Sequence, residues 1–277
     1  MALTRRQFIT GSLKITAAPL LASMGFYQYG QRIEAYDVTL ERVTIPIKGL
    51  PPSLHGFRIV QLSDMHIEPF TPAEVITAAV TMTNQLQPDV IVLTGDYVTD
   101  KPQAIHTLTP LLAPLQAKHG VFAIFGNHDL WTNATVVGEA LTQMGFQLLV
   151  NQGVALGELY LAGVDDCWSG RPNLAAALAQ HQADMPVILL AHEPDFADAF
   201  CQDKRVNLQL SGHTHGGQVR IPGYGAVVLP RHGKKYQAGL YQVDGMWLYT
   251  NRGLGVMPIR QRINCPPEVT EFTLVAA

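Results

Sequence analysis

Charged residues and cysteines are both scarce in this sequence. Lysine, arginine, aspartate and glutamate make up 15% of the 277 residues, and the formal net charge is −3. No basic excess indicates nucleic-acid binding, and no acidic tail is present. The three cysteines, Cys167, Cys201 and Cys265, form no CxxC pair, which argues against a zinc finger or a thioredoxin-like site. The sequence favours small core residues here but leaves one disulfide among them open.

The N-terminus lacks an apolar run that is clearly long enough to span a membrane. Residues 15–26 are mildly apolar, but they are fewer than the roughly 20 that a bilayer requires. They follow the twin arginine Arg5-Arg6, with Phe8 two places later, and this pattern resembles a bacterial twin-arginine export signal. We therefore expect residues 1–30 to be a signal or anchor segment. The protein would be exported to the periplasm or cell envelope by the twin-arginine machinery.

The sequence does not decide whether this segment is cleaved, because no clear Ala-x-Ala site precedes Tyr27. If the segment is retained, it would anchor the protein or bring it into peripheral contact with a membrane. The alternative interpretation is the basic first turn of an ordinary helix. The remaining residues, 31–277, contain no internal repeat and no low-complexity linker, and their length suits a single α/β domain.

Five short apolar runs are each followed by a polar residue that can bind a metal. Such runs, bounded by glycine or polar residues, predict buried strands. The runs are 57–62, 90–93, 121–125, 187–190 and 208–210, and the polar residues after them are Asp64, Asp96, Asn127, His192 and His213. The carboxyl ends of strands are where open α/β sheets bind ligands. Five strands that all end in Asp, Asn or His are difficult to explain by packing alone.

Helices are expected between these strands. Thr71 is a plausible N-cap for a helix over 73–86, and Asn133 for a helix over 134–144. Residues 174–181 are rich in alanine and also predict a helix. The part after Gly223 is rich in Gly, Val and Tyr and predicts strands in hairpins. Alternating strands and helices indicate an α/β fold.

The strand ends form an ordered set of motifs. They are Asp64-x-His66, Gly95-Asp96, Gly126-Asn127-His128-Asp129, His192 and Gly212-His213-Thr214-His215. Over residues 57–218 this set resembles the signature of the calcineurin-like metallophosphoesterase superfamily. With Gly216-Gly217-Gln218, the export-like start and the segment 250–255, the chain is similar to the bacterial phosphodiesterases of the YaeI/YkuE type. The resemblance implies a four-layer α/β/β/α sandwich of two mixed sheets flanked by helices.

The resemblance also implies two divalent metal ions. The first would be bound by Asp64, His66, Asp96 and His215, and the second by Asp96, Asn127, His192 and His213, with Asp96 bridging them. Imidazole, carboxylate and amide oxygen form a donor set suited to Mn, Fe or Zn rather than Ca alone, and Ni is a further candidate.

A charge balance explains why such a site would attract phosphate. Two divalent ions bring four positive charges, two carboxylates remove two and a bridging hydroxide removes one, so the site stays cationic. The hydroxide would attack phosphorus in line with the leaving oxygen, and no phosphoenzyme is required. The resemblance further implies that His128 contacts the phosphate and gives a proton to the leaving group, with Asp129 orienting His128.

The expected reaction is hydrolysis of a P–O bond in a phosphodiester, with a phosphate-containing small molecule or glycolipid as the substrate. Protein Ser/Thr phosphatases carry Asp-Arg-Gly shortly after the position of Asp96 and Glu in place of Asp129, and this sequence has neither. One alternative is a pyrophosphatase of a nucleotide-linked glycolipid of the UDP-diacylglucosamine type, although the export-like signal weighs against a cytosolic nucleotide-sugar. Another is a non-catalytic metal-binding scaffold, which the complete set of ligands disfavours.

Two further features are left open by the sequence. Asp165-Asp166 and Trp168 follow a predicted strand over 159–163, so this loop could border the pocket, but a solvated acidic turn is favoured. Arg252 is either a phosphate contact or a structural arginine.

Overall fold

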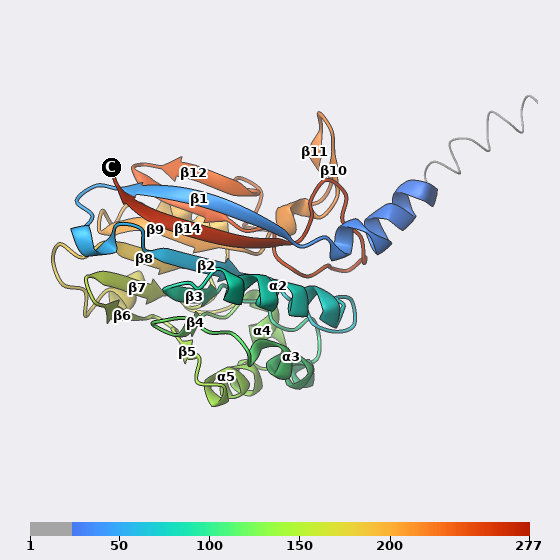
Figure 1. The fold of residues 1–277 in the computed structure, drawn as a ribbon, viewed down its shortest axis with the longest axis horizontal. Helices are drawn as coiled ribbons and strands as arrows, with labels where there is room; N and C mark the ends of the chain where they lie inside the picture. The colour runs from blue at the N-terminus through green and yellow to red at the C-terminus, as the bar shows by residue number, and fades with distance from the viewer. Residues whose placement is uncertain (1–23) are drawn as a thin grey trace, which may run out of the picture.

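Two six-stranded mixed sheets form the body of the protein (Figure 1). The computed structural model describes residues 24–277. The first sheet has the order β1-β14-β2-β3-β4-β5 and contains β1 (Thr39–Ile47), β2 (Arg58–Leu62), β3 (Val90–Leu93), β4 (Val121–Ala123), β5 (Gln147–Leu148) and β14 (Glu268–Ala276). The second has the order β12-β13-β9-β8-β7-β6 and contains β6 (Gln152–Leu156), β7 (Leu159–Gly163), β8 (Val187–Leu190), β9 (Val206–Ser211), β12 (Gly239–Val243) and β13 (Met246–Thr250). A small separate hairpin joins β10 (Arg220–Ile221) to β11 (Gly225–Ala226).

Helices cover the outer face of each sheet. On the side of the first sheet lie α2 (Ala73–Gln85), α3 (Ile105–Leu112), α4 (Asn127–Thr132) and α5 (Ala134–Gln143) (Figure 1). The second sheet is covered by the short helices α6 (Leu174–Ala177) and α7 (Ala197–Phe200). The 3-10 turns are η1 (Glu34–Tyr36), η2 (Pro52–Leu54), η3 (Pro102–Ala104), η4 (Pro194–Phe196) and η5 (His215–Gly217). A further helical segment covers residues 24–32.

Three apolar clusters separate the four layers, because successive side chains of a strand point to opposite faces. From β2 and β3, Val60 and Ile91 point outward and pack with α2, α3 and α5. Ile59 and Val92 point inward and pack against side chains of the second sheet such as Ile188. The outer face of the second sheet packs on α6 and α7. The predicted four-layer α/β/β/α sandwich is therefore confirmed. A single domain over residues 31–277 stays a prediction.

The local predictions are confirmed in some places and wrong in others. Asn133 caps α5, since its side chain accepts hydrogen bonds from the N–H groups of Thr135 and Val136. The expected N-cap role of Thr71 is wrong. The N-cap position of α2 is Pro72, and the Thr71 hydroxyl instead accepts a hydrogen bond from Val256 N–H.

The segment after Gly223 folds only partly into hairpins. β12 and β13 form the expected antiparallel pair. β14, however, returns to the first sheet, where it lies parallel to β1 and antiparallel to β2. The three cysteines are all unpaired, and two of them, Cys201 and Cys265, are buried.

Candidate metal centre

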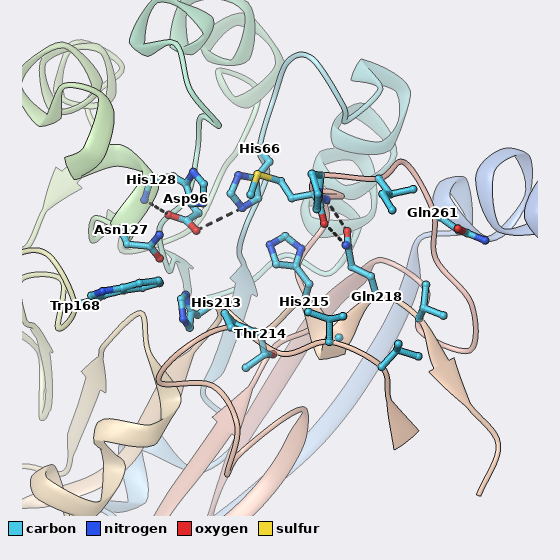
Figure 2. Close-up of a pocket in the computed structure, with 18 of the residues that line it drawn as sticks. His66, Asp96, Asn127, His128, Trp168, His213, Thr214, His215, Gln218 and Gln261 are labelled. Carbon is cyan, nitrogen blue, oxygen red and sulfur yellow. Dashed lines mark hydrogen bonds and ion pairs between the residues drawn. The ribbon is translucent and has the colours of Figure 1, made fainter. Parts of the chain in front are cut away.

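The carboxyl ends of strands from both sheets meet at one site. β2, β3 and β4 run parallel in the first sheet, and β8 and β9 run parallel in the second. The loops after them are joined across the two sheets. The N–H of His213, after β9, donates to both carboxylate oxygens of Asp64, after β2, over 2.9 and 3.0 Å. Figure 2 shows His66, Asp96, Asn127, His213 and His215 turned toward a common space.

The predicted ligands fall into two groups that meet at Asp96. Ligand atoms of Asp64, His66 and His215 lie within 4.8 Å of one another, and so do those of Asp96, His192 and His213. Asp96 lies between the groups, because its Oδ2 is 3.4 Å from His66 Nε2 and 3.1 Å from His192 Nε2. Asn127 is buried beside this set. All seven predicted ligands are thus brought together.

Backbone carbonyls fix the orientation of three of the four imidazoles. His192 donates from Nδ1 to Thr94 O over 2.7 Å, and His213 donates from Nε2 to Arg231 O over 2.7 Å. His215 Nδ1 lies 3.3 Å from Gly255 O. A carbonyl can only accept, so these nitrogens carry a proton, and the opposite ring nitrogen of each can bind a cation when it is deprotonated. Histidines that bind metals are commonly oriented in this way.

Several buried polar atoms of the site have no hydrogen-bond partner among the described residues. They are Nδ1 of His66 and Oδ1 of Asn127, and Nε2 of His66 and of His192 face the Asp96 carboxylate at 3.4 and 3.1 Å without a hydrogen bond. A buried polar atom without a partner costs roughly 1–3 kcal/mol. Neither Asp64 nor Asp96 forms an ion pair with a Lys or Arg in the described part of the chain. Unpartnered nitrogens, an amide oxygen and two carboxylates without a Lys or Arg partner together fit bound divalent cations.

The backbone at the site is strained. A positive φ is costly for residues other than glycine, at about 1–2 kcal/mol each. Five of the seven predicted ligands adopt one, namely Asp64, His66, Asp96, His213 and His215. Strain of this kind persists where surrounding structure imposes it, and it is concentrated at functional sites.

Two glycines of the motifs allow the loops to approach the carboxylates closely. A Cβ atom on Gly126 would collide with the Asp96 carboxylate. One on Gly212 would collide with the Asp64 carboxylate. Any other residue at either position would push its loop away from the site.

Burial and mutual charge set the protonation of the site. Burial opposes the ionisation of Asp96, but the neighbouring His192 outweighs it and holds the pKa of Asp96 well below its usual range. Burial also opposes the charge on His192, and Asp96 in turn raises the pKa of His192 well above its ordinary value. Burial, aided by His192, lowers the pKa of His213 to about 3. The metal-free site therefore keeps a proton on His192, which a bound cation would displace.

His128 lies at the open side of this set. Its ring is half-buried, 4.8 Å from the His66 ring and 4.7 Å from the Trp131 ring between centroids. Its Nδ1 donates to Thr99 O over 2.7 Å, and its backbone N–H donates to Asp96 Oδ1 over 2.9 Å. Burial lowers the pKa of His128. The ring is thus held by Thr99, and Nε2 remains free for a ligand.

The predicted contact between Asp129 and His128 is wrong. The buried carboxylate of Asp129 instead accepts hydrogen bonds from the backbone N–H groups of Asp96 (2.8 Å), Tyr97 (2.9 Å) and Gly126 (2.9 Å). Asp129 sits in the first turn of α4 and can reach the two neighbouring loops from there. It is a positioning residue for the loops that carry Asp96 and Asn127.

In the acidic turn after β7, Asp166 is buried and Asp165 is half-buried, so the turn is not simply solvated. Asp166 is inaccessible to solvent and accepts from the N–H groups of Trp168 and Ser169. Glu193, which sequence reasoning missed, accepts from the N–H groups of Cys167 and Trp168. These carboxylates hold Trp168 in the wall of the cavity (Figure 2). The signal for Glu193 was its place directly after the ligand His192.

Arg252 is a structural residue. Its guanidinium pairs with Glu41 over 2.7 Å and with Glu268 over 2.8 Å, and Arg252 does not line the cavity at the site. Sequence reasoning missed Arg262, whose side chain is fully buried. Arg262 donates to the carbonyls of Arg252, Gly253 and Gly255 over 2.9, 2.9 and 2.5 Å. Arg262 therefore fixes the position of Gly255, whose carbonyl oxygen also lies next to His215 Nδ1.

A cavity of about 590 Å³ opens beside these residues. One part of its wall is formed by His66, Asp96, Asn127, His128, His213 and His215. In the described part of the chain no Lys or Arg lines it. Positive charge in the cavity would therefore have to come from histidines or bound metal ions.

The fold and the site together define a metal-dependent phosphoesterase. The family described as "Calcineurin-like phosphoesterase" matches residues 57–217, and the chain belongs to this family. The predicted class of enzyme, a metal-dependent phosphoric ester hydrolase, is thereby confirmed.

Two bacterial proteins are similar over nearly their whole lengths. The chain is 38% identical to "Uncharacterized metallophosphoesterase YkuE" of Bacillus subtilis, over 98% of this chain and 98% of that protein. It is 33% identical to "Phosphodiesterase YaeI" of Escherichia coli, over 99% of this chain and 100% of that protein. The predicted resemblance to this branch is confirmed. A solved structure of a dimetal phosphatase from Danio rerio shares the fold, with a TM-score of 0.51 at 11% identity, over 74% of this chain and 90% of that one.

The predicted localisation is corrected by two further relatives. The chain is 31% and 32% identical to proteins named "Transmembrane protein with metallophosphoesterase domain" in Bos taurus and Danio rerio, over 99% and 97% of this chain and 64% of each relative. These relatives are named as transmembrane proteins and not as exported ones. The prediction of export through a twin-arginine signal is therefore wrong. The motif behind it, at residues 5–6, lies outside the described residues. Among residues 24–277, no helix combines the length and the apolar character needed to cross a bilayer.

Proposed function

We propose that the chain is a phosphodiesterase that works with two divalent metal ions of the Mn, Fe, Zn or Ni type. Asp64, His66, Asp96 and His215 would hold the first ion, and Asp96, Asn127, His192 and His213 the second. The observation that carries the proposal is the position of Asp96, whose Oδ2 faces a histidine of each group at 3.4 and 3.1 Å. A single carboxylate between two sets of unpartnered nitrogens is suited to bridge two cations.

The residues of the chain prepare the site for reaction. When bound, the metal ions would supply Lewis-acid stabilisation and acidify water. The N–H groups of His128 and His213 hold the carboxylates of Asp96 and Asp64 in place. Thr99 O holds the His128 ring so that Nε2 can contact a phosphate and give a proton to the leaving oxygen. Trp168 forms part of the cavity wall beside these groups.

A diester suits the cavity better than a monoester. A phosphate monoester carries close to two negative charges near neutral pH, and proteins usually hold such groups with Arg or Lys. The described wall of this cavity contains neither. A diester carries a single charge and needs space on both sides of phosphorus, which a cavity of about 590 Å³ provides.

Hydrolysis of bis-p-nitrophenyl phosphate tests the proposal. The chelator-treated protein should be inactive until Mn, Fe, Zn or Ni is returned. Asp96→Asn should remove nearly all activity and lower the metal content, and Asp198→Asn, a surface carboxylate paired with Lys235, should change neither. The diester should be preferred over p-nitrophenyl phosphate. Full activity without metal would contradict the two-metal site, and a preference for the monoester would contradict the substrate class.

Diphosphate cleavage is the second candidate reaction. The same site could cleave the diphosphate of a nucleotide-linked glycolipid of the UDP-diacylglucosamine type, and the apolar part of the cavity wall favours a substrate with an apolar group. Release of UMP from such a substrate at a higher kcat/KM than from any simple diester would select this reaction. A metal-loaded protein that turns over neither class would instead be a metal-binding scaffold.

A further inference from the structure

The cavity beside the metal centre has an apolar half. Beyond His215 its wall passes to Val219, Val227, Val228 and Pro230 on one side. On the other side the wall is formed by Met257, Pro258 and Ile259. The polar groups of this half include Gln218 and Gln261, which lie at the end away from Trp168 (Figure 2).

The two apolar walls are held in fixed positions. The hairpin of β10 and β11 is tied to the second wall, because Arg220 N–H donates to Ile263 O over 2.9 Å. Gln218 joins the walls from within, since its Oε1 accepts from Met257 N–H over 2.6 Å. Arg262 in turn fixes the second wall through the carbonyls described above. These hydrogen bonds hold the two walls in a fixed arrangement, as expected for a binding site.

Apolar side chains stay exposed at this end of the molecule. Tyr224 of the hairpin is 75% exposed, Val228 just after it is 74% exposed, and Ile259 of the facing wall is 56% exposed. The hairpin protrudes from the body of the fold (Figure 1). Val228 and Ile259 line the same cavity, and exposed apolar groups that share a concave site commonly mark a place where a ligand binds.

We propose that this apolar half binds an alkyl or acyl group of the phosphodiester substrate. The inference rests on the proposed function, and it names the substrate class as an amphiphilic phosphodiester. The kind of ligand is inferred from the continuity of the cavity, because one cavity contains both the metal-binding residues and the apolar walls. A ligand that fills it must carry a phosphate at one end and an apolar group at the other. No charged side chain faces the apolar group among the described residues of the wall.

A series of alkyl p-nitrophenyl phosphodiesters tests this inference. Water is consumed, the P–O bond to p-nitrophenol breaks, and the alkyl phosphate remains. Each buried methylene contributes about threefold to fourfold to binding. From the methyl to the octyl ester, kcat/KM should therefore rise at least about tenfold in the metal-loaded protein. A non-hydrolysable octyl phosphonate should inhibit more strongly than the methyl phosphonate.

Variants locate the effect. Val228→Asn and Ile259→Asn, one from each wall, should lower the ratio of octyl to methyl kcat/KM by about fivefold or more. Leu240→Asn removes an equally apolar, exposed side chain on β12, outside the cavity, and should leave the ratio and the methyl rate unchanged. An unchanged ratio in both wall variants would overturn the inference.

The remaining outcomes distinguish the inference from the proposed function. Turnover of the methyl ester with no gain from longer chains overturns the apolar site but leaves the phosphodiesterase standing. No turnover of any diester with metal bound overturns the proposed function. Octyl ester should be offered both as free monomer and in phosphatidylcholine vesicles. Preference for the monomer identifies a free amphiphile as the source, and preference for the vesicle identifies a bilayer lipid.

Discussion

Replacement of Asp129 by Asn tests how the metal-binding loops are held. The variant keeps the size of the side chain but exchanges one acceptor oxygen for an amide NH₂ group. If the remaining oxygen keeps the bonds from Asp96 and Gly126, the NH₂ group faces the N–H of Tyr97, which was 2.9 Å from the carboxylate. One buried N–H without an acceptor costs about 1–3 kcal/mol. The two remaining bonds also lose the assistance of the carboxylate charge.

The expected loss in the free energy of unfolding is therefore about 2–4 kcal/mol. This is a large part of a typical total of about 5–15 kcal/mol. The loop of Asp96 should also loosen, and removal of a residue that positions a ligand typically lowers metal affinity about 10–100-fold. Urea unfolding and titration with Mn, followed by metal content, measure the two effects.

Asn133→Ala is the matched control, because it removes the N-cap of the adjacent helix α5. It should cost about 1 kcal/mol and leave metal affinity unchanged. The reasoning would be refuted if the free energy of unfolding of Asp129→Asn lay within about 1 kcal/mol of the wild-type value and the variant bound Mn equally well. Asp129 would then not hold the loops.

Three further changes probe neighbouring groups. Burial raises the pKa of Glu193 to about 8 from 4.5, so the folded chelator-treated protein keeps a proton that the unfolded chain loses. Its free energy of unfolding should fall from about pH 4.5 to pH 8, and urea unfolding should find a shallower fall in Glu193→Gln. Arg262→Met should cost about 3–5 kcal/mol in the same assay, because three buried carbonyls lose their donor; a loss below 1 kcal/mol would contradict the buried clamp. His128→Ala should retain metal but lose about 10²–10⁴-fold in kcat on diesters with poor leaving groups; an equal loss on p-nitrophenyl esters would argue against proton donation.

The clustering of the candidate metal ligands was predictable because these residues share one kind of position. Asp64, Asp96 and His192 each follow a short apolar strand, and such strands are evident in the sequence as continuous apolar runs. Parallel strands bring their carboxyl ends to one edge, so the clustering follows from the strand assignments. The sandwich of two sheets followed from the family resemblance.

Residues whose role depends on a distant partner were not predictable in this way. Asp129 was expected to contact the preceding side chain, His128, but its bonds reach backbone N–H groups 32 and 33 residues away. Thr71 looks like an N-cap because it precedes an apolar helix, yet its hydroxyl bonds Val256. Arg262 carries no local signal, because only the completed fold encloses its guanidinium among carbonyl groups. Helix caps and strands are local features, whereas buried polar contacts are set by tertiary packing.

The place of β14 in the first sheet determines the order in which the molecule can be completed. β1 has β14 as its neighbour in the sheet, and Thr39 pairs with Glu268, 229 residues further along the chain. During synthesis from the N-terminus, β1 must therefore wait for almost the whole chain before it finds its partner. Pairing at so long a separation is slow, and it leaves strand edges exposed in the meantime. Gly253, whose carbonyl accepts from Glu268 N–H as β14 begins, packs against Asp64. The candidate metal centre therefore takes its final shape only when this late strand is inserted.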